Sequence, residues 1–306
     1  MLQTKTYPHS KYNKMFTQLF RLVIKHIIPV SFFRKPLPNL DQRHQKTGHL
    51  SLELVSHCWQ YSNMLVYQLS SFVNNPPKDL TLTVTLFYSE EDTDTKKTLD
   101  FFSKISVPNV IWNWQATEKH QLFRRGIGRN SAALSSKADW LWFTDCDIIF
   151  HENCLDSLAK QLQEKTDSLF FPREIQVTDM LEEDDPILQA NAQPQVIDIK
   201  TGSFKSHART KAIGPYQIVH GDVARAIGYC DNIRIFQTES DRWRKTYEDT
   251  AFRWLLGTDG TPIDIDSVFQ IRHIKKGRYN EDSKMADLRI ATRKAQKKLT
   301  GDLNNE

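Results

Sequence analysis

The feature that most constrains the fold is a continuous apolar run, Trp140 to Thr144 (WLWFT), followed at once by two aspartates. An apolar run of this length, without polar residues at alternate positions, is typical of a strand that is covered on both faces. Such strands belong to parallel sheets with helices on either side. The run therefore predicts a central strand of an α/β sheet.

Strand-like and helix-like segments alternate before and after this run. Strand–helix–strand alternation implies right-handed crossovers and a Rossmann-like fold, a mainly parallel mixed sheet flanked by helices. The expected strands are Leu50 to Trp59, Leu80 to Tyr88, Val110 to Trp114 and Trp140 to Thr144; the expected helices are Ser62 to Asn74, Thr93 to Lys104, Arg129 to Lys137 and Glu248 to Leu256.

Charge and pattern divide the chain into three parts. Of 306 residues, 39% are hydrophobic and 25% charged, as in a soluble globular protein. Residues 1–46 form a basic amphipathic segment, residues 47–280 one catalytic α/β domain, and residues 281–306 a basic helical tail. Within the domain, Arg173 to Ala212 is interpreted as a variable insertion, either a mobile lid or a solvated loop. The net charge of +4 is too small to argue for nucleic acid, and no recognition motif supports one.

The cysteines and the N-terminal segment bear on the compartment. Four cysteines without C-x-x-C spacing predict buried, reduced thiols, and no secretory leader is recognisable, so we expect a cytoplasmic protein. The stretch Met15 to Phe33 contains Arg21, Lys25 and Pro29, which argues against a spanning helix. Its apolar residues recur at helical spacing. Residues 14–33 are therefore expected either to contact the inner face of an anionic membrane or to pack against the domain or a partner.

The motif Asp145-Cys146-Asp147 directly follows the buried run. In parallel α/β sheets ligands bind at the carboxyl ends of the strands, so acids at this place point into a crevice. Two carboxylates two residues apart can share a hard cation such as Mg²⁺ or Mn²⁺, which keeps positions open for substrate phosphates. A diphosphate leaving group gains negative charge as its bond breaks, and such a cation stabilises it. An isolated D-x-D motif is common by chance. It is informative here because it directly follows the buried apolar run.

A second acidic pair, Glu248-Asp249, precedes the apolar face of an expected helix. Acids at a helix start interact favourably with the helix dipole, which is the plain interpretation. The alternative is that one of them accepts a proton from a hydroxyl group. A partly desolvated carboxylate near phosphates has the raised pKa that such a base needs.

Six motifs in order resemble the inverting glycosyltransferase family 2, which has the glycosyltransferase-A (GT-A) fold. The likeness covers roughly Leu50 to Arg278. The motifs are an acid-rich turn after the second strand (Phe87 to Thr95), Gly128-Arg129-Asn130, Asp145 with Asp147, Gly228-Tyr229 with Asp231, Glu248-Asp249, and His273.

This resemblance implies a role for each matched residue. Asp147 would ligate Mn²⁺ or Mg²⁺ directly, Asp145 would face the ribose or sugar of the donor beside the metal, and His273 would help to hold metal or diphosphate. Asp249 would deprotonate the acceptor hydroxyl in one in-line displacement that inverts the anomeric carbon, with Glu248 in support.

The donor-binding residues implied by the resemblance are Arg129, Asn130 and Glu90. The planar guanidinium of Arg129 suits phosphate oxygens, although a structural ion pair is an equal alternative. In the family, the second strand usually ends in an acid that reads the nucleotide base. Here that position is Ser89 or Glu90, so the base-reading residue departs from the family pattern. The expected donor is a nucleotide-sugar, a UDP-sugar above all.

The sequence also bears on the reaction and its alternatives. The Q-x-x-R-W signature of processive synthases is absent, which favours transfer of one sugar over polymerisation. A cytoplasmic chain with a basic N-terminus suggests a glycan or glycolipid acceptor in surface polysaccharide synthesis. A nucleotidyltransferase would need a Gly-rich phosphate loop after the first strand, where the chain reads Ser56 to Asn63 without glycine. The other alternative is a catalytically silent member, which binds a sugar nucleotide or is the scaffold of an assembly.

Overall fold

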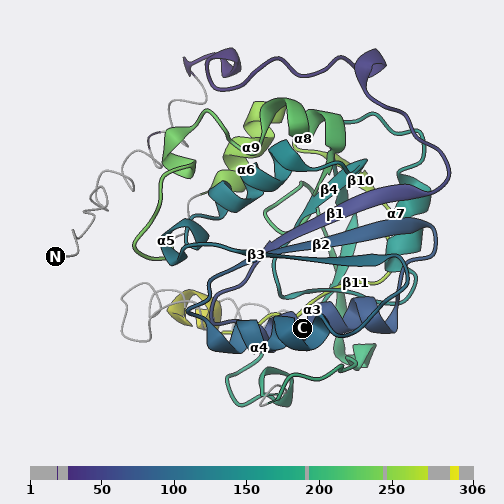
Figure 1. Cartoon of the computed structure of the whole chain (residues 1–306), viewed down its shortest axis with the longest axis vertical. Coiled ribbons are helices and arrows are strands. Elements are labelled where there is room, and N and C mark those ends of the chain that lie inside the picture. The colour runs from purple at the N-terminus through teal and green to yellow at the C-terminus, as the bar shows by residue number, and fades with distance from the viewer. Residues whose placement is uncertain (1–18, 20–26, 190–192, 244–246, 275–289, 296–306) are drawn as a thin grey trace.

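The computed structural model describes residue 19 and residues 27–189, 193–243, 247–274 and 290–295 (Figure 1). Most of the expected amphipathic segment 14–33 and most of the basic tail 281–306 therefore lie outside the described residues. In the part of the chain that is described, no helix is both long and apolar enough to cross a membrane.

The central feature is a seven-stranded sheet with the strand order β10-β6-β9-β4-β1-β2-β3. Strands β1, β2, β3 and β4 pair in parallel, as do β6 and β10, and β9 is antiparallel to both of its neighbours. The predicted α/β fold with a mainly parallel mixed sheet is thus confirmed. The strands are β1 (Leu50–His57), β2 (Leu80–Tyr88), β3 (Val110–Ala116), β4 (Trp140–Phe143), β6 (Leu169–Pro172), β9 (Gln217–His220) and β10 (Thr261–Ile263).

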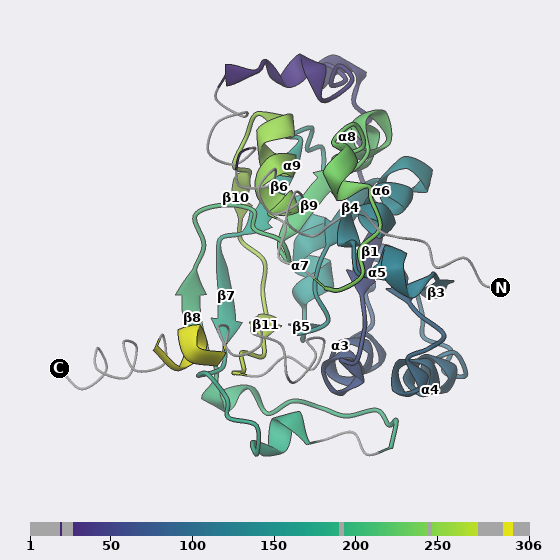
Figure 2. The ribbon, with the colours of Figure 1, turned by 90° about the vertical axis from the view of Figure 1, so that its left-hand side faces the viewer.

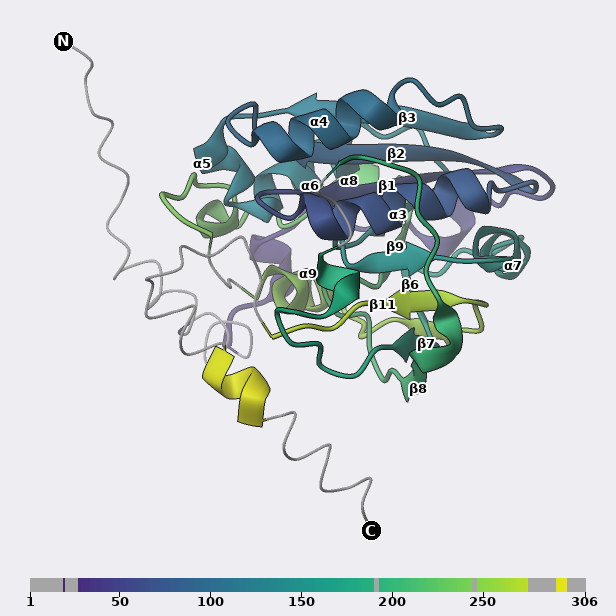
Figure 3. The same ribbon diagram turned by 90° about the horizontal axis from the view of Figure 1, so that it is seen from below.

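The apolar run that opened the sequence argument is β4, and all four of its residues are buried. It lies between β1 and β9, with helices on both sides of the sheet. Figure 3 shows α3 and α4 across one face, and Figure 1 shows α6, α8 and α9 across the other. The helices are α3 (Ser62–Asn74), α4 (Thr93–Phe102), α5 (Lys119–Leu122), α6 (Arg125–Ser135), α7 (Cys154–Gln161), α8 (Gly221–Ile227) and α9 (Glu248–Leu256).

Helix α6 begins four residues before the predicted start at Arg129, and close packing explains its two glycines. A Cβ atom on Gly126 would lie 2.4 Å from the carbonyl oxygen of Phe236, and one on Gly128 would lie 2.3 Å from His57 Nε2. Glycine is usually read as a helix breaker, but here it lets the first turn of α6 approach its neighbours.

A second sheet of four short strands, in the order β5-β11-β7-β8, stands beside the first (Figure 2). Two of its strands lie in the stretch 173–212, which we interpreted as a variable insertion; that interpretation missed the strands. Four residues give too little alternation for a strand to be recognised. The strands are β5 (Ile148–Phe150), β7 (Glu174–Val177), β8 (Lys205–Ala208) and β11 (Val268–Gln270).

The four cysteines are buried and form no disulfide, as their spacing predicted. Near the N-terminus, residues 27–43 cross the molecule above α8 and α9 (Figures 1 and 2). Two short 3₁₀ turns, Val30–Phe32 and Leu40–Gln42, shape this segment.

Candidate active site

The turn between β4 and β5 carries Asp145 and Asp147 at the carboxyl end of the central strand. Gln68 on α3 holds this turn, because its Nε2 donates to the carbonyl oxygens of Asp145 and Ile148, each at 2.9 Å. The backbone nitrogen of Ile271 donates to the carbonyl oxygen of Asp147 at 3.0 Å, which places the segment after β11 alongside. The side chain of Asp147 is buried, and that of Asp145 is 17% exposed.

Two arginines on one side of α6 face Asp145. Arg125 Nη1 lies 2.5 Å from Asp145 Oδ1, and Arg129 Nη2 lies 3.8 Å from the same oxygen. The guanidinium of Arg125 also lies 5.9 Å from the ring centre of Trp243. Sequence reasoning missed Arg125. Its signal was a pair of arginines, Arg124 and Arg125, at a helix N-terminus, where the helix dipole disfavours cations and favours anions.

Arg129 is 1% exposed and connects three parts of the site. Its Nη1 donates to Tyr229 Oη at 2.9 Å, and its Nη2 donates to the carbonyl oxygen of Gly214 at 3.1 Å. The structure thus brings Arg129 to Asp145 within the protein, in contact with a carboxylate; its contact with a diphosphate stays a prediction.

Asn130 joins two of the predicted motifs. Its Nδ2 donates to Asp231 Oδ1 at 2.7 Å, and its Oδ1 accepts from the backbone nitrogen of Tyr229 at 2.8 Å. Gly228 has φ +64°, and a Cβ there would lie 2.2 Å from Asn130 Oδ1. The position therefore requires glycine for both conformation and space.

The second acidic pair lies beside the first, although the two are far apart in sequence. Tyr247, with φ +57°, starts α9, so Glu248 and Asp249 occupy its first turn. A Cβ on Gly214, whose carbonyl accepts from Arg129, would lie 4.0 Å from Asp249 Cβ. Glu248 is buried, whereas the carboxylate of Asp249 is 27% exposed and lies 3.4 Å from Arg253 Nη1.

His57, at the carboxyl end of β1, was also missed. Its ring stacks on Phe87 with centroids 4.9 Å apart and lies against Gly128 of α6. Burial, and then the positive charges of Arg129 and Arg125, lower the pKa of His57 well below its ordinary value. The imidazole is therefore neutral at pH 7. No sequence pattern distinguished this histidine from the others.

His273 lies next to the turn that carries Asp147, but its ring has a partner. Its Nε2 is hydrogen-bonded to Tyr61 Oη, and its carbonyl oxygen accepts from Arg293. Among the described residues, no three His, Cys, Asp or Glu side chains gather into a metal-binding group. The structure brings Asp145 and Asp147 together in one turn, with His273 close in the fold and turned to Tyr61.

Glu90 lies on the exposed turn after β2 and pairs with Lys96; its carboxylate also accepts from Tyr88 Oη at 2.8 Å. The hydrogen bond from Lys96 is the largest cause that lowers the pKa of Glu90. The structure shows no contact between Glu90 and the residues around Asp145 in the described part of the chain. The buried acid nearby is Asp92, which caps α4 by accepting from Thr95.

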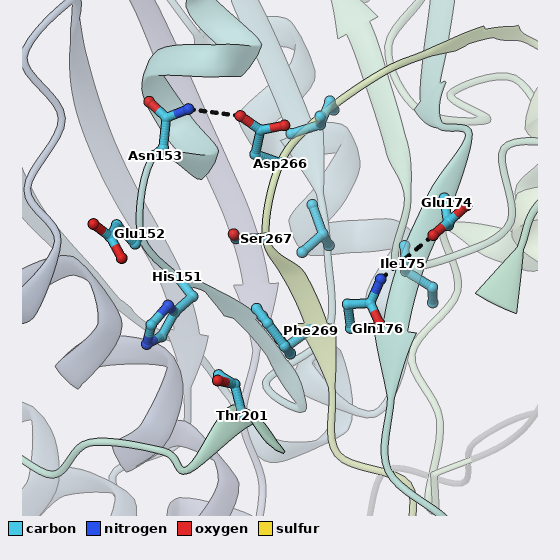
Figure 4. A pocket seen from close by; sticks show the side chains of 12 residues that line it. His151, Glu152, Asn153, Glu174, Ile175, Gln176, Thr201, Asp266, Ser267 and Phe269 are labelled. Carbon is cyan, nitrogen blue, oxygen red and sulfur yellow. Dashed lines mark hydrogen bonds between the residues drawn. The ribbon is translucent and has the colours of Figure 1, made fainter. Parts of the chain in front are cut away.

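A separate polar cavity of about 620 Å³ lies at the other end of the second sheet (Figure 4). His151, Asn153, Glu174 and Asp266 are among its lining residues. Because β5 and β11 are antiparallel, His151, which follows β5, lies where β11 begins, whereas Asp147, which precedes β5, lies beside the end of β11. The cavity is therefore distinct from the acidic site.

The fold and site define an α/β protein with carboxylates and guanidiniums gathered at the carboxyl edge of its sheet. No family model and no curated protein matches the sequence. Solved structures do resemble it. Residues 1–349 of S. aureus TarS match with 13% identity over 73% of this chain and 58% of that chain, with a TM-score of 0.39.

Two other solved structures are similar. TarS 1–349 in complex with UDP matches with 12% identity over 72% of this chain and 60% of that chain, with a TM-score of 0.44. The mannosyltransferase PcManGT from Pyrobaculum calidifontis, in complex with GDP-Man and Mn²⁺, matches with 12% identity over 95% of this chain and 75% of that chain, with a TM-score of 0.46. The chain spans less than two thirds of the TarS chains that it matches. Likenesses at this identity concern the arrangement of elements and not the chemistry of a site.

Proposed function

We propose that this chain transfers one sugar from a nucleotide-sugar donor to an acceptor hydroxyl, with inversion at the anomeric carbon. One observation carries the proposal: Arg129 lies 3.8 Å from Asp145 and donates to the carbonyl oxygen of Gly214, the residue next to which Asp249 lies, so two acids from distant parts of the sequence meet around one arginine. Ligands of parallel α/β sheets bind at this edge.

The diphosphate of the donor would bind where positive charge is concentrated. Arg125 and Arg129 face this place from the N-terminal turn of α6, whose dipole adds to their field. Asp145 Oδ1 lies within 4 Å of both guanidiniums, at 2.5 Å from Arg125 Nη1 and 3.8 Å from Arg129 Nη2. A diphosphate would add a guanidinium–phosphate contact of the strong, charge-assisted kind to the partly exposed Arg125, with the buried Arg129 adding its charge from within the protein.

The residues present also fit Mn²⁺ or Mg²⁺. Such a cation is held in proteins by one or two carboxylates together with substrate phosphates, so a group of three protein ligands is not needed. Asp147 would bind it directly, with Asp145 beside it; His273 lies on the adjacent segment, where its Nε2 is hydrogen-bonded to Tyr61 Oη. When bound, the cation neutralises the negative charge that the leaving diphosphate gains.

Asp249 would act as the general base, with the buried Glu248 in support. In one step the acceptor oxygen forms its bond to the anomeric carbon, and its proton passes to Asp249. The bond from that carbon to the diphosphate breaks, and its electron pair leaves with the nucleoside diphosphate. The partial exposure of Asp249 suits a group that must reach an acceptor.

The remaining features of the proposal concern specificity. A UDP-sugar is the expected donor, with Asn130 and Glu90 as further donor contacts, and the acceptor is a glycan or glycolipid of a surface polysaccharide pathway. The region around Glu90 would lie near the base because it follows β2, the strand next to β1.

The test measures binding and turnover of a panel of nucleotide-sugars by purified protein with Mn²⁺, Mg²⁺ or a chelator. We expect Asp147→Ala to abolish metal-dependent donor binding. Asp249→Asn should keep binding and lose roughly a hundredfold or more of the turnover. Asp94→Asn is the matched control, since Asp94 is an exposed acid on α4. If no donor binds with either metal, the proposal is wrong and the silent scaffold becomes the better interpretation.

A further inference from the structure

Residues 27–40 present a row of exposed apolar side chains on the outside of the molecule. Phe32 is 75% exposed, Ile27 is 73% exposed and Leu40 is 61% exposed, with Ile28 also among the exposed apolar residues. Large apolar side chains that are exposed singly are ordinary on protein surfaces. Here several fall within one short segment, and such a concentration marks an interaction surface.

The backbone of this segment is held on the domain, so these side chains are presented by ordered structure. Phe33 packs edge-on against Trp254 of α9, with ring centroids 5.5 Å apart. At the other end, the buried Arg43 donates from Nη1 to the carbonyl oxygen of Thr166 and from Nε to that of Pro38 at 3.0 Å. Phe33 thus points toward the domain, whereas its neighbour Phe32 is exposed.

The charge of the segment indicates what it contacts. Residues 27–40 contain Arg34 and Lys35 and no acid. Arg34 Nη1 donates to the backbone carbonyl oxygen of Lys35 at 3.1 Å, which holds the guanidinium against the segment. Exposed apolar residues beside cations, without acids, suit the interface of an anionic lipid bilayer, where apolar side chains enter the acyl boundary and cations meet the headgroups.

We propose that residues 27–40 form a docking surface for an anionic membrane, with Ile27, Phe32 and Leu40 inserted and Arg34 and Lys35 at the headgroups. Phe33 connects this surface to α9, whose first residues are Glu248 and Asp249. If the proposed function holds, this connection would place the catalytic base at a fixed height above the bilayer and select an acceptor that is lipid-linked. The selection of a lipid-linked acceptor rests on the proposed function, whereas membrane docking does not.

The experiment is co-sedimentation of the full chain with vesicles of phosphatidylcholine alone or with phosphatidylglycerol, at low and high salt. We expect binding to the anionic vesicles that salt weakens. The double variant Ile27→Ser/Phe32→Ser should lower the partition coefficient at least about tenfold. Arg34→Gln/Lys35→Gln should lower it roughly fivefold for each cation removed, and only on anionic vesicles.

A matched control is available on the same protein. Ile111 on β3 and Leu134 on α6 are also exposed, at 53% and 41%, but lie outside the segment. The variant Ile111→Ser/Leu134→Ser should bind vesicles as the parent chain does. Unchanged vesicle binding by Ile27→Ser/Phe32→Ser, or equal losses in the control, would refute the proposal.

Two further readouts separate this proposal from others. If the surface instead joins two copies of the chain, sedimentation velocity without lipid will show a dimer that Phe32→Ser dissociates, and the proposal is wrong. Donor binding in solution tests the proposed function separately: Ile27→Ser/Phe32→Ser should leave it unchanged. Loss of vesicle binding with intact donor binding supports membrane docking, whereas absent donor binding in the parent chain counts only against glycosyl transfer.

Discussion

Arg125 and Arg129 face the same carboxylate oxygen from one helix but differ in burial, which allows a paired test. Arg129 is 1% exposed and Arg125 22% exposed. Replacing Arg129 with Met removes three charge-assisted hydrogen bonds, to Tyr229 Oη, to the carbonyl oxygen of Gly214 and, at 3.4 Å, to that of Thr144. Such bonds are each worth about 1.5–3 kcal/mol, and the loss of a buried charge offsets part of the total. We expect the free energy of unfolding to fall by about 3 kcal/mol.

Arg125→Met should behave differently. Its ion pair with Asp145 is partly exposed, so the expected loss of stability is below about 1 kcal/mol. If the diphosphate of the donor binds at Arg125, inorganic diphosphate should compete with the donor for this place. The affinity for inorganic diphosphate in this competition should be about tenfold lower in the variant, because a charge-assisted contact to phosphate is lost.

Urea denaturation of both variants and the parent chain measures the first difference, and donor competition measures the second. The slopes of the denaturation curves should stay equal, so that midpoints report stability. Equal losses of stability in the two variants, or a larger loss in Arg125→Met, would refute this account of the site.

Two further predictions concern residues that surround the acidic site. Gly228→Ala should lower the free energy of unfolding by about 2–4 kcal/mol, because alanine is strained at φ +64° and its Cβ would displace the Asn130 side chain. Urea denaturation measures this loss of stability. A loss below about 1 kcal/mol would contradict the described contact. The lowered pKa of His57 predicts a pH effect. Below pH of about 6.5 the unfolded chain binds a proton that the folded chain refuses, so stability falls as the pH falls. Unfolding at pH 7.5 and 5.5 should show a smaller fall for His57→Gln than for the parent chain, since the buried His220 and the partly exposed His207, whose pKa values burial also lowers, keep their share. An identical fall in both proteins would show that His57 is not the source.

Four strands of the main sheet could be predicted: β1, β2 and β3 are long enough to show their pattern, and β4 is a continuous apolar run, whereas the three- and four-residue strands β6, β9 and β10 were missed. Strand β2 and helix α9 have the bounds that the sequence indicated. The second sheet could not be predicted, since β5 and β11 have three residues each and β7 and β8 four. These short strands form by pairing with neighbouring strands, and their own sequences show no strand pattern.

The acids of the site could be predicted because each stands at the end of a recognisable element. Asp145 follows a buried strand, and Asp249 begins an amphipathic helix. The basic side of the site was harder. In the sequence, Arg125 cannot be told from any surface arginine, because its position depends on the register of α6. His57 cannot be told from the other histidines, because only the fold places Gly128 against it. The Tyr61 partner of His273 likewise depends on two segments that meet only in the folded chain.

The turn that carries Asp145 and Asp147 has little backbone freedom left. Gln68 on α3 and Ile271 beyond β11, from two different parts of the fold, donate to its carbonyl oxygens. Recognition of a substrate here would therefore proceed by rotation of side chains over a stationary frame. Engineers who wish to change which substrate this protein accepts should leave the turn unaltered and vary the surrounding loops.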